Sequence, residues 1–372
     1  MRAAVLHQPG EPLRIEDLEL DDPRPGEVRV RVAAAGVCHS DYHYMTGDLP
    51  CRLPIVVGHE GSGTVEAVGE GVESVAPGDL VTMLWRPRCG RCRYCVIGQP
   101  VMCELGKVQA STNGLPDDGT TRLRLDGREV YHLMGVSSFA EQVVVSEKSV
   151  VPVPDGVPAR IAAIAGCAVV TGVGAVLNVV GECAGRALLV MGAGGVWLAA
   201  VMGARLAGAD PIVVVDVDDA KLDKARQLGA TQLVNGREAD VVEAVPEGVA
   251  WAIEAVGSAQ TLQQCIACLR PGGTAIAVGL GRVGATFEVP INEIVQRQKR
   301  VVGSLYGSAN PLVDLPRLFG LYLAGRLPLD ELLGADYALE QVNEAYAALT
   351  QGAVGRAVVV PCPGSRPRHS IS

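Results

Sequence analysis

Residues 187–216 read ALLVMGAGGVWLAAVMGARLAGADPIVVVD and contain the pattern that decides the fold. An apolar run of strand length enters a glycine-rich turn, an alanine-rich segment suited to a helix follows, and a second apolar run ends at Asp216. A strand, a turn, a helix and a second strand in this order are typical of a parallel sheet with helices crossing its faces. We therefore predict a doubly wound α/β domain around this stretch.

The same alternation continues downstream of Asp216 and extends the predicted parallel sheet. Helices are expected at residues 219–230 and 259–269, and strands at 231–235, 251–257 and 272–280. We place a Rossmann-type dinucleotide-binding domain at residues 168–308.

Short β-branched segments separated by turn signals dominate the chain before this domain. They predict a mainly β, barrel-like domain over residues 1–167. The chain should return to that domain through residues 309–361, with helices at 316–327 and 339–352 and a strand at 355–361. Residues 362–372 lack periodicity, and we expect them to be disordered.

The composition of the 372 residues limits the possible functions. The 32 basic and 41 acidic side chains give a net charge of −9, which argues against a general binder of nucleic acids or anionic membranes. Residues 161–181 carry no charge, but their mild hydropathy and their glycines favour a buried helix pair over a membrane span. No signal peptide is visible at the N-terminus, so we expect a cytoplasmic protein.

Four of the 11 cysteines lie close together in CGRCRYCVIGQPVMC, at Cys89, Cys92, Cys95 and Cys103. Four thiolates at this spacing can surround one tetrahedral ion, and a site closed by four protein ligands is structural rather than catalytic. An iron–sulfur cluster and unrelated reduced thiols are the alternatives. We predict a structural zinc site in a lobe at about residues 88–104.

A second candidate metal site is dispersed along the chain. Cys38 lies in GVCHSDYH, His59 in GHEGSGTVEAVG and Cys167 in AGCAVVTGVGA. Two thiolates and one imidazole would leave a zinc ion one open coordination position, as catalytic sites do. The spacing of these residues in the sequence does not show that they form one site. Each of them, taken singly, is more often an ordinary side chain of the core.

The local sequences of these three residues, with the four-cysteine lobe, YHLMGVSSFAEQVVV (131–145) and the glycine turn, resemble a known family. They are similar to the zinc-dependent alcohol dehydrogenases of the medium-chain dehydrogenase/reductase superfamily. The resemblance extends over nearly all of residues 1–361 and implies a GroES-like first domain. The segment between Cys103 and Phe139 is similar to the long-loop branch, and residues 303–333 are similar to its actinobacterial members.

The resemblance assigns Cys38, His59 and Cys167 to the catalytic zinc, with Glu60 as an occasional alternate ligand. Asp41 would orient the imidazole of His59. The reaction that the family implies is NAD-dependent oxidation of an alcohol to an aldehyde or ketone, or the reverse, by hydride transfer.

The resemblance also implies a proton path from the substrate hydroxyl through Ser40 and His43. Such a pair is chemically sensible, because the hydroxyl proton needs a route to solvent. The alternative is that both are ordinary turn residues. His39 and Arg356 would lie near the cofactor pyrophosphate, and Thr171 would pack against the nicotinamide ring.

The glycine turn carries the expected dinucleotide contacts, because backbone N–H groups at a helix N-terminus can approach a pyrophosphate. The residues that we expect to contribute there are Gly192, Gly194, Gly195 and Val196. The carboxylate of Asp216 would bond the adenosine ribose and repel a 2′-phosphate, which favours NAD over NADP. The resemblance adds Lys221 to that ribose site.

Trp197 stands where the fingerprint G-x-G-x-x-G has its third glycine. That glycine normally allows the helix to pack closely against the strand. Either the surroundings tolerate the indole as a repacked side chain, or the indole weakens or alters nucleotide binding. It would be accommodated by a displaced helix, by swinging outward or by occupying cofactor space.

The family pattern places Leu49, Trp85 and Phe139 around an apolar substrate pocket. Branch members that act on a thiol adduct of formaldehyde carry acidic groups near the position of Leu49. This chain has only Asp48 there, although Lys107 could meet a substrate carboxylate. We therefore favour a primary or bulky secondary alcohol as the substrate.

The expected cofactors are two zinc ions per chain and NAD, and the family implies a homodimer or homotetramer. Two other functions stay open. One is the same zinc scaffold with permanently bound or weakened NAD, performing zinc-assisted lyase or thiol chemistry. The other is a thiol-adduct-dependent formaldehyde dehydrogenase. A non-enzymatic role fits poorly with the intact set of candidate site residues.

Overall fold

The computed structural model describes residues 1–192 and 194–361, which form two compact units. The first unit contains Met1–Cys92, Cys103–Gly166 and the described chain from Leu333 onward. The second contains Arg93–Met102 and Cys167–Leu332, so it keeps residues 309–332, which we expected in the first domain. The expected tail at residues 362–372 lies outside the described residues.

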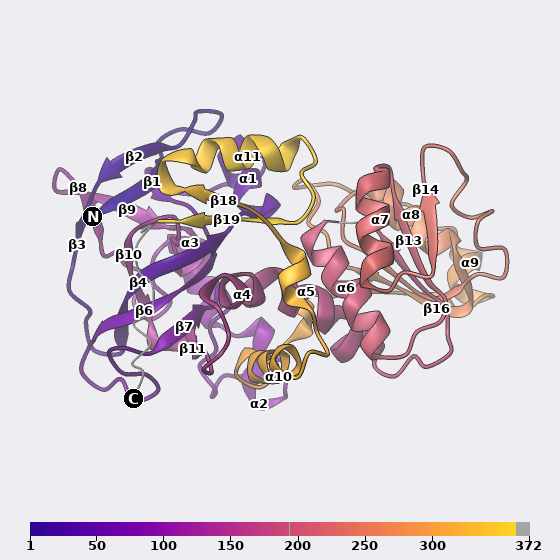
Figure 1. Ribbon diagram of the computed structural model, residues 1–372, viewed down its shortest axis with the longest axis horizontal. Helices are drawn as coiled ribbons and strands as arrows, with labels where there is room; N and C mark the ends of the chain where they lie inside the picture. Colours follow the sequence, from indigo (N-terminus) through magenta and orange to yellow (C-terminus); the bar gives the residue numbers. More distant parts are fainter. Residues whose placement is uncertain (193, 362–372) are drawn as a thin grey trace. The chain divides into compact units, whose positions relative to one another are not determined.

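Six parallel strands form the sheet of the second unit (Figure 1). Their order is β14-β13-β12-β15-β16-β17, so the chain starts at a central strand and extends the sheet first to one side and then to the other. This order confirms the doubly wound fold. The strands are β12 (Leu188–Met191), β13 (Ile212–Asp216), β14 (Gln232–Asn235), β15 (Val249–Glu254), β16 (Leu269–Ala277) and β17 (Arg300–Gly303).

Two of the helices that connect or follow these strands, α7 and α8, begin at residues whose side chains cap them. The side chain of Asp218 accepts a hydrogen bond from the backbone of Ala220, and that of Ser258 accepts one from Thr261. The helices are α6 (Gly195–Leu206), α7 (Asp219–Leu228), α8 (Ala259–Ala267), α9 (Ile291–Val295) and α10 (Pro311–Leu323). The last one starts earlier than residue 316, because Pro311 occupies a first-turn position that needs no N–H partner.

The uncharged segment forms one helical run over Ala159–Val180 rather than the helix pair that we expected. It consists of α4 (Ala159–Ile164), a π-helical stretch (Ala165–Val169), α5 (Val170–Gly174) and a second π-helical stretch (Ala175–Val180). The run is long and apolar enough to cross a membrane, yet 78% of an 18-residue window within it is buried inside the protein. Burial of this kind is what the core helix of a folded domain shows.

Two sheets make up most of the first unit. One has the order β2-β1-β5-β9-β8-β3, and the other has the order β11-β7-β6-β4-β19-β18 with β10 paired to β4. The strands of the first sheet are β1 (Arg2–Leu6), β2 (Arg14–Asp17), β3 (Glu19–Leu20), β5 (Ile55–Val56), β8 (Leu123–Leu125) and β9 (Arg128–His132). Those of the second are β4 (Glu27–Gly36), β6 (Glu60–Val68), β7 (Leu80–Met83), β10 (Gln142–Ser146), β11 (Val150–Pro152), β18 (Leu333–Ala338) and β19 (Arg356–Val360).

Four more α-helices are described, of which α2 belongs to the second unit and the other three to the first. They are α1 (His39–Thr46), α2 (Arg93–Val96), α3 (Leu105–Thr112) and α11 (Val342–Thr350). The strand near the C-terminus, β19, pairs antiparallel with β4, so residues from both ends of the sequence are neighbours in one sheet. This pairing positions β19 beside the end of β4, where the chain turns into α1.

Candidate functional site: two metal centres and a glycine turn

Four buried side chains from separate parts of the sequence meet in one cluster. Ligand atoms of Cys38, His59, Glu60 and Cys167 all lie within 4.8 Å of one another. Cys38 follows β4 and directly precedes α1, while His59 directly precedes β6, which begins with Glu60. Two sulfurs and one imidazole nitrogen are the donor set of a zinc site that leaves one position open, so the residues fit this metal.

Asp41 in the first turn of α1 holds the imidazole of His59. Its Oδ1 atom lies 2.8 Å from His59 Nδ1 and also accepts the backbone N–H of Gly58 at 3.2 Å. Both side chains are almost completely buried. Burial lowers the pKa of His59, but the charges of Asp41 and Cys38 raise it more, so that in the metal-free protein it lies well above its ordinary value. The contact leaves Nε2 as the nitrogen for a metal.

Glu60 is paired with a buried arginine from β19. Arg356 Nε donates to Glu60 Oε2 at 3.0 Å, and a second guanidinium nitrogen bonds the other carboxylate oxygen. Burial raises the pKa of Glu60, and the guanidinium of Arg356 opposes that rise. Sequence reasoning missed this pair and placed Arg356 at the pyrophosphate.

A glycine in β4 makes room for the pair of Glu60 and Arg356. A Cβ on Gly36 would lie 2.1 Å from Glu60 Oε2, closer than any such contact allows. Gly36 is also the partner of Glu60 in the register of β4 and β6. The glycine itself is visible in the sequence, but its role can be recognised only from the register of β4 and β6.

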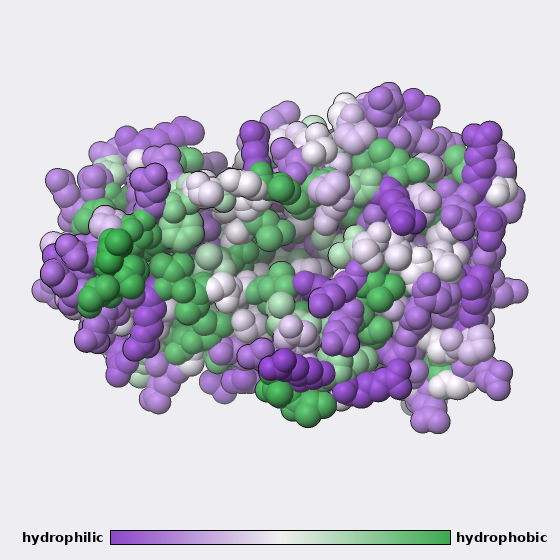
Figure 2. All heavy atoms as spheres, turned by 180° about the vertical axis from the view of Figure 1, so that it is seen from behind, coloured by the Kyte–Doolittle hydropathy of each residue, from purple (hydrophilic) through white to green (hydrophobic). Residues whose placement is uncertain are grey.

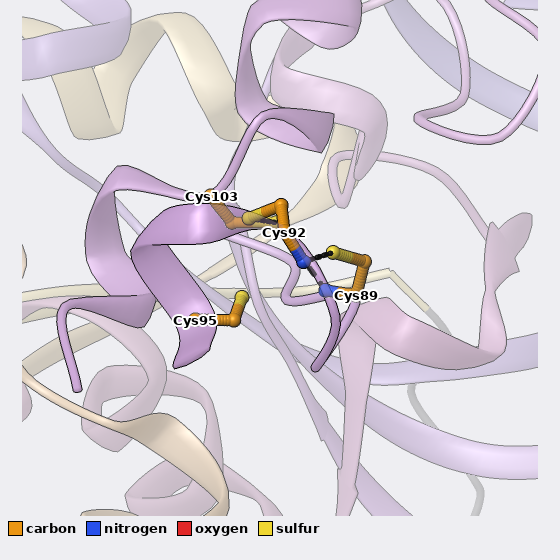
Figure 3. A group of neighbouring side chains, drawn as sticks. All are labelled: Cys89, Cys92, Cys95 and Cys103. Atoms are coloured by element: carbon orange, nitrogen blue, oxygen red, sulfur yellow. Dashed lines mark hydrogen bonds between the residues drawn. The ribbon is translucent and has the colours of Figure 1, made fainter. Parts of the chain in front are cut away.

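The side chains of the four-cysteine lobe also converge (Figure 3). Their sulfur atoms lie within 4.8 Å of one another, and Cys95 reaches the group from α2. Backbone N–H groups of Cys89 and Cys92 donate to the sulfurs of Cys103 and Cys89 at 3.3 and 3.2 Å. Burial raises the pKa of Cys89, but N–H donors from Arg91 and Cys92 lower it more, and the net shift is downward. Four converging sulfur atoms fit a closed zinc site.

Both residues of the expected proton path, Ser40 and His43, lie on α1. Ser40 Oγ lies 3.6 Å from Cys38 Sγ. His43 Nδ1 lies 3.2 Å from Oδ2 of Asp48, and Thr46 donates its hydroxyl to the same oxygen at 3.0 Å. Sequence reasoning treated Asp48 only as a pocket residue and missed its contact with His43. His39 is exposed at the start of α1.

The three residues expected in the substrate pocket lie in different environments. Trp85 sets its ring edge-on to the imidazole of His59, with 6.1 Å between ring centroids. Leu49 is half-buried just after α1. Phe139 is fully enclosed in the core and meets Tyr346 edge to face at 6.0 Å. Trp85 therefore lies against one of the candidate catalytic metal ligands.

The glycine turn joins β12 to α6, with Gly192 at a φ of 104° and Gly194 as the N-cap. Gly195 and Val196 begin the helix. Asp216 ends β13, and its Oδ1 atom accepts the backbone N–H groups of Val217 and Asp218 at 2.8 and 3.0 Å. A helix N-terminus and a carboxylate at the ends of neighbouring parallel strands fit a dinucleotide.

Two other expected cofactor residues lie on helices of the second unit. Lys221 is half-buried in the first turn of α7. Thr171 lies in α5 with 8% of its surface exposed, and its hydroxyl has no hydrogen bond within the part of the chain that the structure describes. Trp197, in the first turn of α6, turns its indole onto the glycine turn itself.

Comparisons with known proteins agree with this arrangement. Residues 24–155 match the alcohol dehydrogenase GroES-like domain, and residues 195–319 match the zinc-binding dehydrogenase family. The chain is 40% identical to the NDMA-dependent alcohol dehydrogenase of Amycolatopsis methanolica, over 96% of this chain and 98% of that protein. It is 35% identical to the S-(hydroxymethyl)glutathione dehydrogenase of Komagataella pastoris, over 96% and 97%.

A solved structure shows the same likeness in three dimensions. The crystal structure of benzyl alcohol dehydrogenase from Acinetobacter calcoaceticus superposes with a TM-score of 0.90 at 31% identity, covering 96% of this chain and 98% of that one. The family acts as oxidoreductases on CH–OH groups and binds zinc and a nicotinamide dinucleotide. This chain belongs to the zinc-dependent alcohol dehydrogenases of the medium-chain dehydrogenase/reductase superfamily.

Proposed function

We propose that this protein oxidises an apolar primary or bulky secondary alcohol with NAD, or reduces the corresponding carbonyl compound. The observation that carries the proposal is the cluster of Cys38, His59 and Cys167, whose ligand atoms lie within 4.8 Å of one another. The ring of Trp85 beside His59 supplies an apolar wall at this centre. Bound zinc and NAD would supply Lewis-acid polarisation of the alcohol oxygen and acceptance of a hydride.

The residues around the cluster have separate tasks in this proposal. Asp41 holds His59 in the tautomer that directs Nε2 to the metal. Glu60 stays bonded to Arg356, so the fourth coordination position is left to the substrate. The ion pair keeps the carboxylate charge balanced by an equally buried guanidinium, which avoids the cost of a lone buried charge.

Ser40 and His43 take up the proton that leaves the substrate hydroxyl. The hydroxyl of Ser40 lies beside Cys38, and the half-exposed imidazole of His43 lies later on the same helix. Asp48 bonds Nδ1 of His43 and so fixes the ring, with Thr46 holding the carboxylate in turn. This route leads the proton to solvent, so no additional charged side chain is needed beside the metal to accept it.

NAD is the proposed cofactor because of Asp216 at the end of β13. A carboxylate at this position bonds ribose hydroxyls and repels a 2′-phosphate. Lys221 at the start of α7 and Thr171 on α5 would contribute to the ribose and nicotinamide contacts respectively. The four-cysteine lobe would hold the second zinc ion, which serves the fold rather than the reaction.

We further propose that the protein works as a homodimer or homotetramer in the cytoplasm. Large apolar side chains are exposed around α9, and Figure 2 shows an apolar patch on the part of the second unit that carries this helix. Val283, Ile291 and Val295 are exposed by 76, 79 and 65%. Contact with a second copy would remove this surface from water.

The test uses purified protein, a panel of alcohols including benzyl alcohol, and the absorbance of NADH. We expect oxidation with NAD and two zinc ions per chain by metal analysis. The Cys38→Ser variant should lose one zinc ion and all turnover. The Cys183→Ser variant changes a buried thiol outside both clusters and should keep two zinc ions and full turnover. Turnover by Cys38→Ser equal to that of the unaltered protein would refute the proposal.

A further inference from the structure

The indole of Trp197 lies over the backbone of the glycine turn. An ideal Cβ on Gly194 would be 2.4 Å from Trp197 Cζ3 and 2.7 Å from Cε3. One on Gly192 would be 2.8 Å from Cε2 and 2.9 Å from Cδ2. Carbon atoms that are not bonded prefer separations of about 3.5–4.0 Å. The ring therefore fills the space on both glycines that a side chain would otherwise use.

This space has a defined use in a dinucleotide fingerprint. The second glycine, here Gly194, lacks a side chain so that the backbone can approach the pyrophosphate. The pyrophosphate then accepts hydrogen bonds from N–H groups at the helix N-terminus, which is the start of α6. In this chain the place that the glycine leaves open is taken by an aromatic ring of the same helix.

The other two ways of accommodating Trp197 disagree with the contacts. A displaced α6 would have moved away from its neighbours, yet a Cβ on Gly172 of α5 would be only 2.1 Å from the carbonyl oxygen of Val196. An outward-swinging ring would not touch Gly192 and Gly194. The helix keeps its close packing, and the indole lies on the turn.

The indole nitrogen gives the ring a reason to leave this position. Trp197 Nε1 is buried and has no hydrogen bond partner within the described residues. A buried donor without a partner is costly, so a rotamer that exposes it to water or to a phosphate oxygen recovers part of the packing that is lost. The unpartnered donor therefore reduces the preference for the closed position without removing it.

We infer that Trp197 blocks the pyrophosphate position of the cofactor site, so that a ligand carrying a pyrophosphate binds only after the indole has moved. This rests on the proposed use of NAD. The adenosine end is a different part of the proposed site, because the ribose would be bound by Asp216 at the end of β13, whereas the indole lies on Gly192 and Gly194 of the turn. Trp197 therefore weakens binding of dinucleotides and ADP-ribose, but not of adenosine.

The experiment titrates the zinc-loaded protein with adenosine, ADP-ribose and NAD, by calorimetry or by NMR for weak ligands. Trp197→Gly restores the fingerprint, and Trp197→Ala is a second variant that avoids a flexible residue in the first helical turn. Trp251→Phe is the matched control, since Trp251 lies in β15 of the same unit with Arg186 over its ring. We expect ADP-ribose and NAD to bind at least tenfold more tightly to both Trp197 variants than to the unaltered protein. The dissociation constant of adenosine should change by less than twofold in these variants. Trp251→Phe should leave all three dissociation constants unchanged.

Fluorescence gives a readout that does not depend on activity. ADP-ribose should shift the tryptophan emission of the unaltered protein to the red as the indole leaves the turn, and the shift should disappear in Trp197→Phe. Equal affinity of ADP-ribose for the unaltered protein and both variants would overturn the inference, and so would an equal gain for adenosine. A gain for ADP-ribose without any alcohol oxidation would support the inference and refute the proposed function instead.

Discussion

Oδ1 of Asp41 lies 2.8 Å from Nδ1 of His59, and neither side chain reaches solvent. The same oxygen accepts the N–H of Gly58, so the carboxylate ties the start of α1 to the residues that enter β6. Burial and the charge of Asp41 also raise the pKa of Tyr346 in α11 well above the ordinary value. One carboxylate thus sets the orientation of a candidate metal ligand and joins α1 to the residues before β6.

Replacing Asp41 with Asn should weaken the catalytic zinc site about 10- to 100-fold, because outer carboxylates raise the basicity of the ligand imidazole and fix its orientation. Zinc content after dialysis against a mild chelator measures the effect, and the lobe should keep its own ion. Asp48→Asn is the matched control, because Asp48 contacts His43, and neither residue belongs to a metal cluster of the described chain. Unchanged zinc retention in Asp41→Asn would contradict the assigned role.

Replacing Cys92 with Ser should remove the lobe zinc, lowering the metal content from two ions per chain to one. The reason is that a closed site has no spare ligand, and metal binding is coupled to the folding of the lobe. We expect a lower thermal midpoint, with the catalytic zinc retained. Cys265→Ser, a buried thiol of α8 outside both clusters, should retain two ions. Two zinc ions in Cys92→Ser would show that the lobe does not bind the metal as a set of four.

The nucleotide preference should depend on Asp216. The Ala variant loses a charge-assisted hydrogen bond to the ribose, worth about 1.5–3 kcal/mol, and it loses the repulsion of a 2′-phosphate. We expect the ratio of kcat/KM for NAD over NADP to fall by roughly 10- to 100-fold. Asp219→Ala is a nearby control on α7, where Asp219 contacts Asn235. Equal efficiency with both nucleotides in the unaltered protein would exclude this role for Asp216.

The fold class was predictable because the pattern at residues 187–216 and its continuation reflect local preferences. A strand run, a glycine turn and a helix each depend on neighbours in sequence, and the parallel sheet follows from their order. The missed strand β17 (Arg300–Gly303) is short and follows a polar segment, so its place comes from pairing with β16 rather than from its own composition.

The candidate site was only partly predictable, for a physical reason. Cys38, His59 and Cys167 were identified through their local sequences, since spacing could not join them. The pair of Glu60 and Arg356 depends on the register of β4 with β6 and with β19, which no local pattern contains. The contact of Trp197 with the glycine turn depends on a side-chain rotamer, and the sequence left three possibilities for it.

A buried histidine far from both metal clusters in sequence should make stability depend on pH. His132 ends β9, its Nε2 atom accepts the backbone N–H of Arg122 at 3.2 Å, and its Nδ1 atom has no partner within the described residues. Burial and the charge of Arg122 lower its pKa from 6.5 to about 3. The folded protein therefore keeps this ring neutral over a range in which the unfolded chain binds a proton.

The sign of the effect follows from the lowered pKa of His132. Between pH 6.5 and about 3 the unfolded state binds more protons at His132 than the folded state does. The free energy of unfolding is therefore not reduced by this histidine above pH 6.5, and it decreases as the pH falls below that value. One group gives at most about 1.4 kcal/mol per pH unit. His132→Gln should lower stability at neutral pH and show a shallower decrease between pH 6.5 and 4, measured by urea denaturation. Protonation of metal ligands affects both proteins alike and cancels in the difference, so parallel pH profiles would disprove the role of His132.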